Sequence, residues 1–135
     1  MREKVMVQKA NTKTGWQSFR DLHVWQRALE LTTAVYRLTQ LFPREEAFGL
    51  TAQMRRCAIS IPSNLAEGHG RMSSREFKRF LLIARGSNCE LQTQLEVTRA
   101  LALGDPQLLS RVQNLSYEVE KMLVALLIKL KEKSG

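Results

Sequence analysis

Four segments of this chain repeat apolar side chains at the spacing of an α-helix, and only short breaks separate them. Pro43 follows the first segment, Gly68 and Gly70 close the second, and Gly104 separates the third from the fourth. A repeat of three to four residues places apolar side chains on one face of a helix, and short connections make successive helices neighbours. The pattern therefore predicts an all-α fold, arranged as an antiparallel up-down four-helix bundle.

The first two helices are expected before and after the first of these breaks. The first begins at Asp21, a natural N-cap, and ends at Leu41, and the second begins near Arg44. Pro62 lies inside the second helix, where it cannot donate a hydrogen bond to the carbonyl of Ala58, so we predict a kink or a break there. The predicted inner faces are Trp25, Ala28, Leu29, Thr32, Val35, Tyr36 and Thr39 in the first helix, and Ala47, Leu50, Met54, Ala58, Ile61 and Leu65 in the second.

Capping residues mark the starts of the third and fourth helices. Ser73 and Glu76 have the spacing of a capping box, in which each side chain accepts a hydrogen bond from the backbone N–H of the other. This third helix is expected to continue to about Leu103. Asp105 is then the N-cap of the fourth helix, and Pro106 is at its first position, where a missing N–H is harmless. The predicted seam of the fourth helix is Leu108, Val112, Leu115, Val119, Met122 and Leu126.

A chain of 135 residues is long enough for one hydrophobic core. Residues 1–18 are polar, basic and without an apolar period, so they are predicted to be a flexible leader, and residues 19–135 are predicted to form the four-helix bundle domain. The leader has no apolar core of a signal peptide, and no apolar run approaches the ~20 residues that span a bilayer. We therefore expect a cytoplasmic protein without membrane contact.

Residues that usually carry catalysis are sparse. His23 and His69 are the two histidines, and neither has the spacing of a metal-binding motif or of a helical ribonuclease. Cys57 and Cys89 lie 32 positions apart without a C-x-x-C pairing, so neither a disulfide nor a zinc site is indicated. No Gly-rich phosphate loop or G-x-S-x-G motif occurs. The sequence therefore indicates no catalytic residue, metal or cofactor.

The third helix has two apolar faces. The first face should pack inside the bundle, and the second, on roughly the opposite side, consists of small or apolar residues at helical spacing. A helix that is apolar on both sides is either deeply buried or shared with a neighbour, and a small bundle cannot enclose a whole helix. We therefore predict a homo-oligomer whose interface is Leu82, Gly86, Cys89, Thr93, Val97 and Ala100.

The net charge of +8 is concentrated in the leader and in the third helix. Residues 71–104 have six basic and three acidic side chains, a net charge of +3. Basic segments attract phosphate polyanions, although basic surfaces also serve solubility. The residues predicted to bind nucleic acid are Arg55, Arg56, Arg71, Arg75, Lys78 and Arg79. Only Phe77 and Phe80 lie among them, and both look buried, so any binding should have little sequence selectivity.

Several polar residues are placed among apolar positions of the second and third helices. A hydrogen-bonded network that fixes helix register is the favoured interpretation, ahead of a catalytic one, with Arg55 or Arg85 neutralising a carboxylate. The predicted members of this structural polar network are Ser60, Asn64, Glu67, Arg85, Glu90 and Gln94.

Two sequence stretches, SIPSNLAEG (Ser60 to Gly68) and EFKRFLLIARGSNCELQTQL (Glu76 to Leu95), are too long and irregular to recur by chance. With the preceding FRDLHVWQRALELTTAVYRLTQLFP (Phe19 to Pro43), they resemble the four-helix-bundle proteins encoded in intervening sequences of bacterial large-subunit ribosomal RNA genes. That family includes relatives of the accessory variability protein of diversity-generating retroelements. The resemblance implies a helical bundle, commonly a homopentameric ring, with suspected nucleic-acid binding and no established catalysis.

Two function classes follow from the sequence. The first is a non-catalytic, basic homo-oligomer that binds structured RNA or DNA with low sequence selectivity. The second is a protein-interaction scaffold, or an accessory subunit for a partner such as a reverse transcriptase, without direct contact with nucleic acid. Salt-sensitive binding to RNA or DNA separates them, because counterion release is the mark of phosphate contacts.

Overall fold

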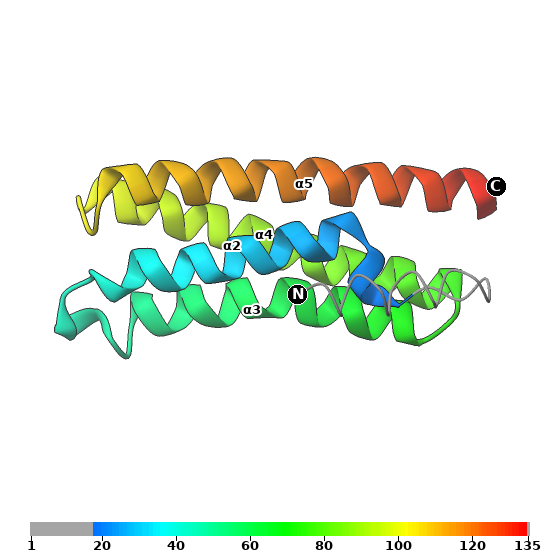
Figure 1. Cartoon of the computed structure of the whole chain (residues 1–135), viewed down its shortest axis with the longest axis horizontal. Coiled ribbons are helices and arrows are strands. Elements are labelled where there is room, and N and C mark those ends of the chain that lie inside the picture. Colours follow the sequence, from blue (N-terminus) through cyan, green and yellow to red (C-terminus); the bar gives the residue numbers. More distant parts are fainter. Residues whose placement is uncertain (1–17, 135) are drawn as a thin grey trace.

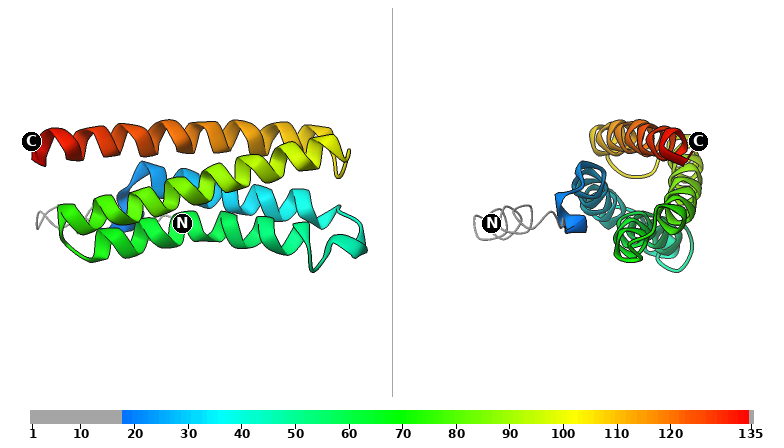
Figure 2. Two further views of the ribbon diagram at one scale, coloured as in Figure 1. Left: turned by 180° about the vertical axis from the view of Figure 1, so that it is seen from behind. Right: turned by 90° about the vertical axis from the view of Figure 1, so that its right-hand side faces the viewer.

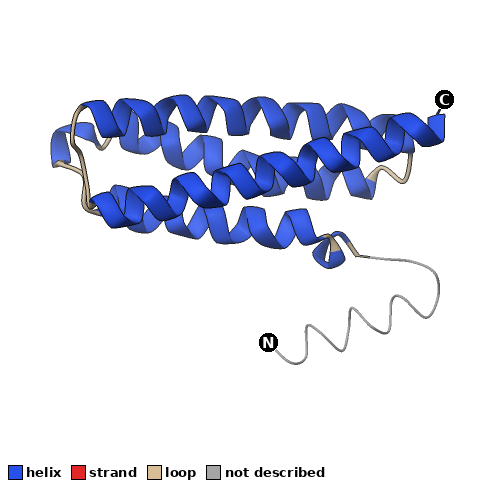
Figure 3. Ribbon diagram, turned by 90° about the horizontal axis from the view of Figure 1, so that it is seen from above, coloured by secondary structure: helices blue, strands red, loops and turns tan. Residues whose placement is uncertain are grey.

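The computed structural model describes the backbone of residues 18–134, so almost all of the predicted leader lies outside the described residues. Four long helices make up most of this part of the chain: α2 (His23–Gln40), α3 (Leu50–Gly70), α4 (Ser74–Ala100) and α5 (Pro106–Ser134). Two short 3-10 turns precede α2 and α3, η1 (Phe19–Asp21) and η2 (Arg44–Glu46), and residues 18–134 contain no strand (Figure 3). The predicted all-α fold with four helices is confirmed.

The chain reverses its direction at each connection, so every helix runs back along the one before it (Figure 1). The end-on view of Figure 2 shows the four helices around a common centre, with α2 and α4 at opposite corners. Each of these two helices packs against both α3 and α5. The core is therefore the space that all four helices enclose.

Leucine, isoleucine, valine and methionine side chains from every helix fill this space. Burying one such side chain contributes about 1.5–3 kcal/mol relative to leaving it in water. The largest fully buried side chains are Leu31, Val35, Leu38, Met54, Ile61, Leu65, Leu81, Leu91, Leu95, Val112, Val119 and Leu123.

The buried face of α2 is rotated from the predicted one. Leu29 and Tyr36 were predicted inside but are 39% and 37% exposed, whereas Leu31 and Leu38 are completely buried. The reason is that α2 contacts α5 as well as α3, so its buried stripe is wide and is centred on Leu31 rather than on the edge that faces α3.

The start of α2 also differs from the prediction. Its N-cap is Leu22, which makes no side-chain capping bond, and Asp21 instead belongs to the preceding turn η1. There the Asp21 carboxylate accepts a hydrogen bond from the Ser18 N–H at 3.3 Å, and the Ser18 hydroxyl accepts one from the Arg20 N–H at 3.1 Å. A capping box therefore forms, but it caps the short turn and not the long helix.

Pro62 does not break α3, which continues from Leu50 to Gly70. The carbonyl of Ala58, which a proline cannot satisfy, lies 3.0 Å from the Thr32 hydroxyl of α2. The same hydroxyl lies 2.8 Å from the carbonyl of Ala28 in its own helix. Thr32 therefore supplies a donor for the carbonyl that Pro62 leaves free, and the helix can pass through the proline in a buried environment.

Thr32→Val is expected to lower the free energy of unfolding by about 1–3 kcal/mol, because it leaves the buried carbonyl of Ala58 without a donor. In a Pro62→Ala background the backbone N–H of residue 62 can donate to that carbonyl. Thr32→Val should therefore lower the free energy of unfolding by clearly less in this background. Urea denaturation of the four proteins of this double-mutant cycle measures the difference. If Thr32→Val lowers the free energy of unfolding equally with Pro62 and with Pro62→Ala, Thr32 does not compensate for the proline.

The start of α3 and the end of α4 differ from the prediction by a few residues. The second helix starts later than expected, at Leu50, and Ala47, predicted inside, is exposed in the connection. The third helix ends at Ala100 rather than near Leu103, because Ala102 adopts a left-handed conformation (φ 54°) and the Leu103 N–H bonds back to the Thr98 carbonyl at 3.1 Å. This is the geometry of a Schellman-type helix end.

The start of α5 is as predicted. Asp105 accepts a hydrogen bond from the Gln107 N–H at 2.8 Å, and Pro106 is the first helical residue. None of the described helices is long and apolar enough to cross a membrane.

Candidate nucleic-acid interface

The connection between α3 and α4 gathers four of the six predicted nucleic-acid-binding residues. Arg71 follows the last residue of α3, and Arg75, Lys78 and Arg79 lie in the first two turns of α4. All four side chains are exposed or half-exposed. We call these four residues the basic corner.

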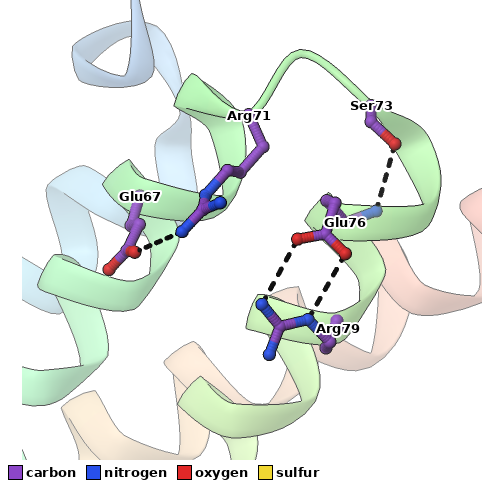
Figure 4. Close-up of polar contacts among 5 residues, drawn as sticks. All are labelled: Glu67, Arg71, Ser73, Glu76 and Arg79. Carbon is purple, nitrogen blue, oxygen red and sulfur yellow. Dashed lines mark hydrogen bonds and ion pairs between the residues drawn. The ribbon is translucent and has the colours of Figure 1, made fainter.

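Two members of the basic corner are paired with carboxylates, as Figure 4 shows. Arg71 Nη2 lies 2.9 Å from Glu67 Oε2, and Arg79 Nη2 lies 3.2 Å from Glu76 Oε1. Within residues 18–134, Arg75 and Lys78 form no ion pair. With four cations and two carboxylates, the corner keeps a net charge of +2.

The hydrogen bond from Arg79 is the largest cause that holds the pKa of Glu76 below its ordinary value. Glu76 therefore remains ionised at neutral pH and continues to attract Arg79. Both side chains are open to solvent, where ion pairs are weak and are screened by salt. A phosphate group can therefore compete with Glu76 for the arginine.

A surface hollow of about 510 Å³ lies within the basic corner, lined by Ser73, Arg75, Glu76, Lys78, Arg79 and Leu82. It is at the N-terminal end of α4, where Ser73 caps the helix by accepting a hydrogen bond from the Glu76 N–H at 3.3 Å. The predicted capping box is only half formed, because the Glu76 carboxylate pairs with Arg79. The positive end of the helix dipole adds to the two unpaired cations and favours an anion here.

The structure places Arg55 and Arg56 away from the basic corner. They precede the end of α3 by about fifteen residues, or roughly 22 Å along the helix. Arg55 donates to the Thr39 hydroxyl at 2.9 Å, and its guanidinium lies 4.5 Å from the ring centre of Tyr36. Arg56 is exposed and forms no ion pair with a described residue. The six predicted residues therefore form two separate groups.

The aromatic side chains near the basic corner are not available for base stacking. Phe80 is 5% exposed, and the guanidinium groups of Arg71 and Arg79 lie over its ring. Phe77 is half-buried and meets His69 edge to face, with ring centres 6.0 Å apart. The corner therefore offers charge but no stacking surface.

The six residues of the predicted polar network do not form one network. Ser60 donates to Ser87 at 2.6 Å, and Asn64 donates to the Ser60 carbonyl at 2.7 Å, so these two residues do lie together. Gln94 instead contacts the buried thiol of Cys57 at 3.5 Å. Glu90 also hydrogen-bonds this thiol, so it lies beside Gln94. The other two members are separate: Glu67 pairs with Arg71, and Arg85 faces α5.

A polar cluster between α4 and α5 was not anticipated from the sequence. Asn88 is completely buried, accepts a hydrogen bond from Ser116 at 2.8 Å and donates to the Ser116 carbonyl at 3.1 Å. Beside it, Arg85 Nε lies 2.8 Å from Glu120 Oε2, and this hydrogen bond raises the pKa of Arg85. Asn88 continues the helical spacing of Leu81, Ala84 and Leu91 on the buried face of α4, and a polar residue in that pattern was the signal in the sequence. The cluster fixes the register of the two helices.

The cysteines differ in their surroundings. Cys57 is buried, and its burial raises the pKa of the thiol, whereas Cys89 is exposed on α4. Among the described residues, no group of three or more His, Cys, Asp or Glu side chains could hold a metal ion.

The second apolar face of α4 points away from the bundle. Leu82 and Val97 are 51% and 41% exposed, and Gly86 and Cys89 are also open to solvent. A Cβ atom added at Gly86 would meet nothing within 4 Å. We call this face the α4 stripe, consisting of Leu82, Gly86, Cys89, Thr93, Val97 and Ala100.

Comparison with known proteins gives one family and one fold. The family model of the 23S rRNA-intervening sequence protein matches residues 20–125. A crystal structure from Bacteroides thetaiotaomicron, described as a protein with unknown function from the S23 ribosomal protein family, superposes with a TM-score of 0.70. The two chains are 24% identical over 77% of this chain and 94% of the other, which supports a shared fold. No curated protein is similar enough to match.

Proposed function

Because the chain belongs to the 23S rRNA-intervening sequence protein family, we propose that it is a non-catalytic, homo-oligomeric four-helix bundle that binds structured RNA or DNA. The observation that carries this proposal is the basic corner, where Arg75 and Lys78 have no carboxylate partner among the described residues and lie beside a hollow at the start of α4. Phosphate oxygens are the natural ligands of such a corner.

One subunit alone offers a weak site, because two of its four cations are already paired with carboxylates. Self-association through the α4 stripe repeats the corner, so that one polyanion can touch several copies at a high effective concentration. The basic corner adjoins the stripe along α4, since Leu82 lines the hollow and is also the first residue of the stripe. We propose a closed ring, with five subunits as the expected number from the family resemblance.

Binding should be weakly selective for sequence. The corner presents guanidinium and ammonium groups without an exposed aromatic ring, so it can read charge and shape but has no stacking surface for bases. Double-stranded or folded nucleic acid therefore fits better than an extended single strand.

Reversing Arg75, Lys78 and Arg79 to Glu is expected to weaken binding to a labelled RNA hairpin and to a DNA duplex. Fewer counterions are released, so the slope of log affinity against log salt should flatten by about 0.9 for each duplex phosphate that the variant no longer neutralises. Fluorescence anisotropy at several salt concentrations measures both effects, and light scattering checks that the variant remains assembled.

The matched control reverses Arg37, Arg44 and Arg111, three exposed arginines near the α2–α3 and α4–α5 connections. These connections lie at the other end of the bundle from the α3–α4 connection (Figure 1). The net charge of this control changes by the same amount as that of the basic-corner variant. A general effect of charge would therefore weaken nucleic-acid binding equally in both variants. If the basic-corner variant remains assembled and binds as well as the parent, the corner is only a solvated surface.

That result would favour the second candidate, a scaffold or accessory subunit that binds a protein partner. Exposed apolar side chains give this candidate its support: Phe48 is fully exposed, and Leu41 and Leu101 are more than half exposed.

A further inference from the structure

A second exposed apolar surface lies over the groove between α2 and α3. Leu29, Tyr36 and Ile59 are 39%, 37% and 44% exposed. The two helices run in opposite directions, and the pairs Thr32 with Ala58 and Tyr36 with Arg55 fix their register. In this register Ile59 lies across the groove from the stretch of α2 between Leu29 and Tyr36. We call Leu29, Tyr36 and Ile59 the α2–α3 patch.

The α2–α3 patch and the α4 stripe are complementary in size. The patch presents one aromatic ring and two branched side chains, whereas the centre of the stripe consists of Gly86, Cys89 and Thr93. Large side chains of one helix pair pack closely where the facing helix has small ones, because the backbones can then approach. Gly86, with open space around its Cα, would receive such a side chain.

The charges beside the two surfaces are also complementary. Glu90 and Glu96 border the stripe, because they follow Gly86 and Thr93 by one helical turn. Arg55 and Arg56 border the patch on α3. Within the described residues none of these four side chains has an ion-pair partner. Opposite charges around an apolar centre direct which surfaces meet.

The two surfaces lie on different sides of the bundle, since α2 and α4 occupy opposite corners (Figure 2). One subunit can therefore use both at the same time. We propose that the α4 stripe of one copy packs on the α2–α3 patch of the next copy. This inference rests on the proposed self-association and gives it a head-to-tail contact, the kind that closes into a ring. It also assigns Arg55 and Arg56 to the subunit contact rather than to phosphate binding.

The test mixes two variants that each remove a different half of the contact. Gly86→Glu places a carboxylate in the stripe, and Ile59→Glu places one in the patch; both positions are exposed, so the fold should be retained. Each variant alone should run as a monomer of 15.5 kDa in light scattering coupled to size exclusion. An equimolar mixture should form a dimer of twice that mass and nothing larger, because it contains one intact stripe and one intact patch.

The control is Ile128→Glu, the same change at a residue of α5 that is 54% exposed and outside both surfaces, and it should remain assembled. If Ile59→Glu assembles like the parent, or if the mixture remains monomeric, the patch is not the partner of the stripe, although self-association still stands. If the parent protein is itself monomeric at tens of micromolar, the proposed self-association is wrong as well.

Discussion

Gly86→Glu is expected to dissociate the proposed homo-oligomer into single subunits of 15.5 kDa without loss of helicity. The new carboxylate would lie in the middle of the α4 stripe, and burying an unpaired charge in an interface costs several kcal/mol at every contact of a ring. Within the subunit the change is harmless, because nothing lies within 4 Å of the new Cβ position. Glycine also destabilises an exposed helix interior by about 1 kcal/mol relative to alanine, so the isolated helix should gain stability.

The reactivity of the Cys89 thiol measures the same dissociation into single subunits. The thiol is exposed in the single subunit and lies within the stripe, so assembly should protect it from a thiol reagent and Gly86→Glu should restore its reactivity. Gly70→Glu is the matched control, since that position is also open and lies outside the stripe. If Gly86→Glu retains the parent mass, or if Cys89 reacts equally fast in both proteins, the stripe is not a subunit contact.

The four helices could be predicted because their signals are local. Ser73, Asp105 and Pro106 mark helix starts through side chains that act on their own backbone, and the structure confirms all three. The rotation of α2 could not be predicted in the same way. Which stripe is buried depends on how many neighbours a helix has, and Leu31 and Leu38 are buried because α2 contacts both α3 and α5.

The continuity of α3 depends on a contact between segments far apart in the sequence. A proline inside a helix predicts a kink or a break when only its own helix is considered. The Thr32 hydroxyl, 26 residues before Ala58, satisfies the carbonyl that Pro62 leaves free. No spacing rule within one helix contains that information.

For the candidate site, the sequence indicated where cations are concentrated but not how they are partnered. Arg71 and Arg79 have carboxylates one helical turn away in the sequence, and both pairs form. Arg55 stacks on Tyr36, which only the packing of α2 on α3 brings close. The six predicted nucleic-acid-binding residues therefore separate into the basic corner and a pair beside the α2–α3 patch.

Gly68→Ala is expected to lower the free energy of unfolding by about 1–3 kcal/mol through overpacking. Gly68 is where α3 meets the start of α4, and a Cβ atom there would lie 2.6 Å from Phe80 Cβ and 3.2 Å from Phe77 Cδ1. Phe80 Cβ is attached directly to the backbone, so a rotamer change cannot relieve the overlap and α4 itself must shift. The gain in helix propensity, up to about 1 kcal/mol, offsets only part of this cost.

Urea denaturation should be measured in the Gly86→Glu background, so that subunit dissociation does not contribute to the measured stability. Gly70→Ala is the control two residues away, where nothing lies within 4 Å, and it should not destabilise. Because Gly68 positions the first turns of α4, its replacement should also displace Arg75, Lys78 and Arg79. In the assembled protein we therefore expect Gly68→Ala to weaken nucleic-acid binding, although no charge has changed. Unaltered stability would mean that α3 and α4 have room to separate, and unaltered binding at reduced stability would mean that the basic corner does not depend on this close approach.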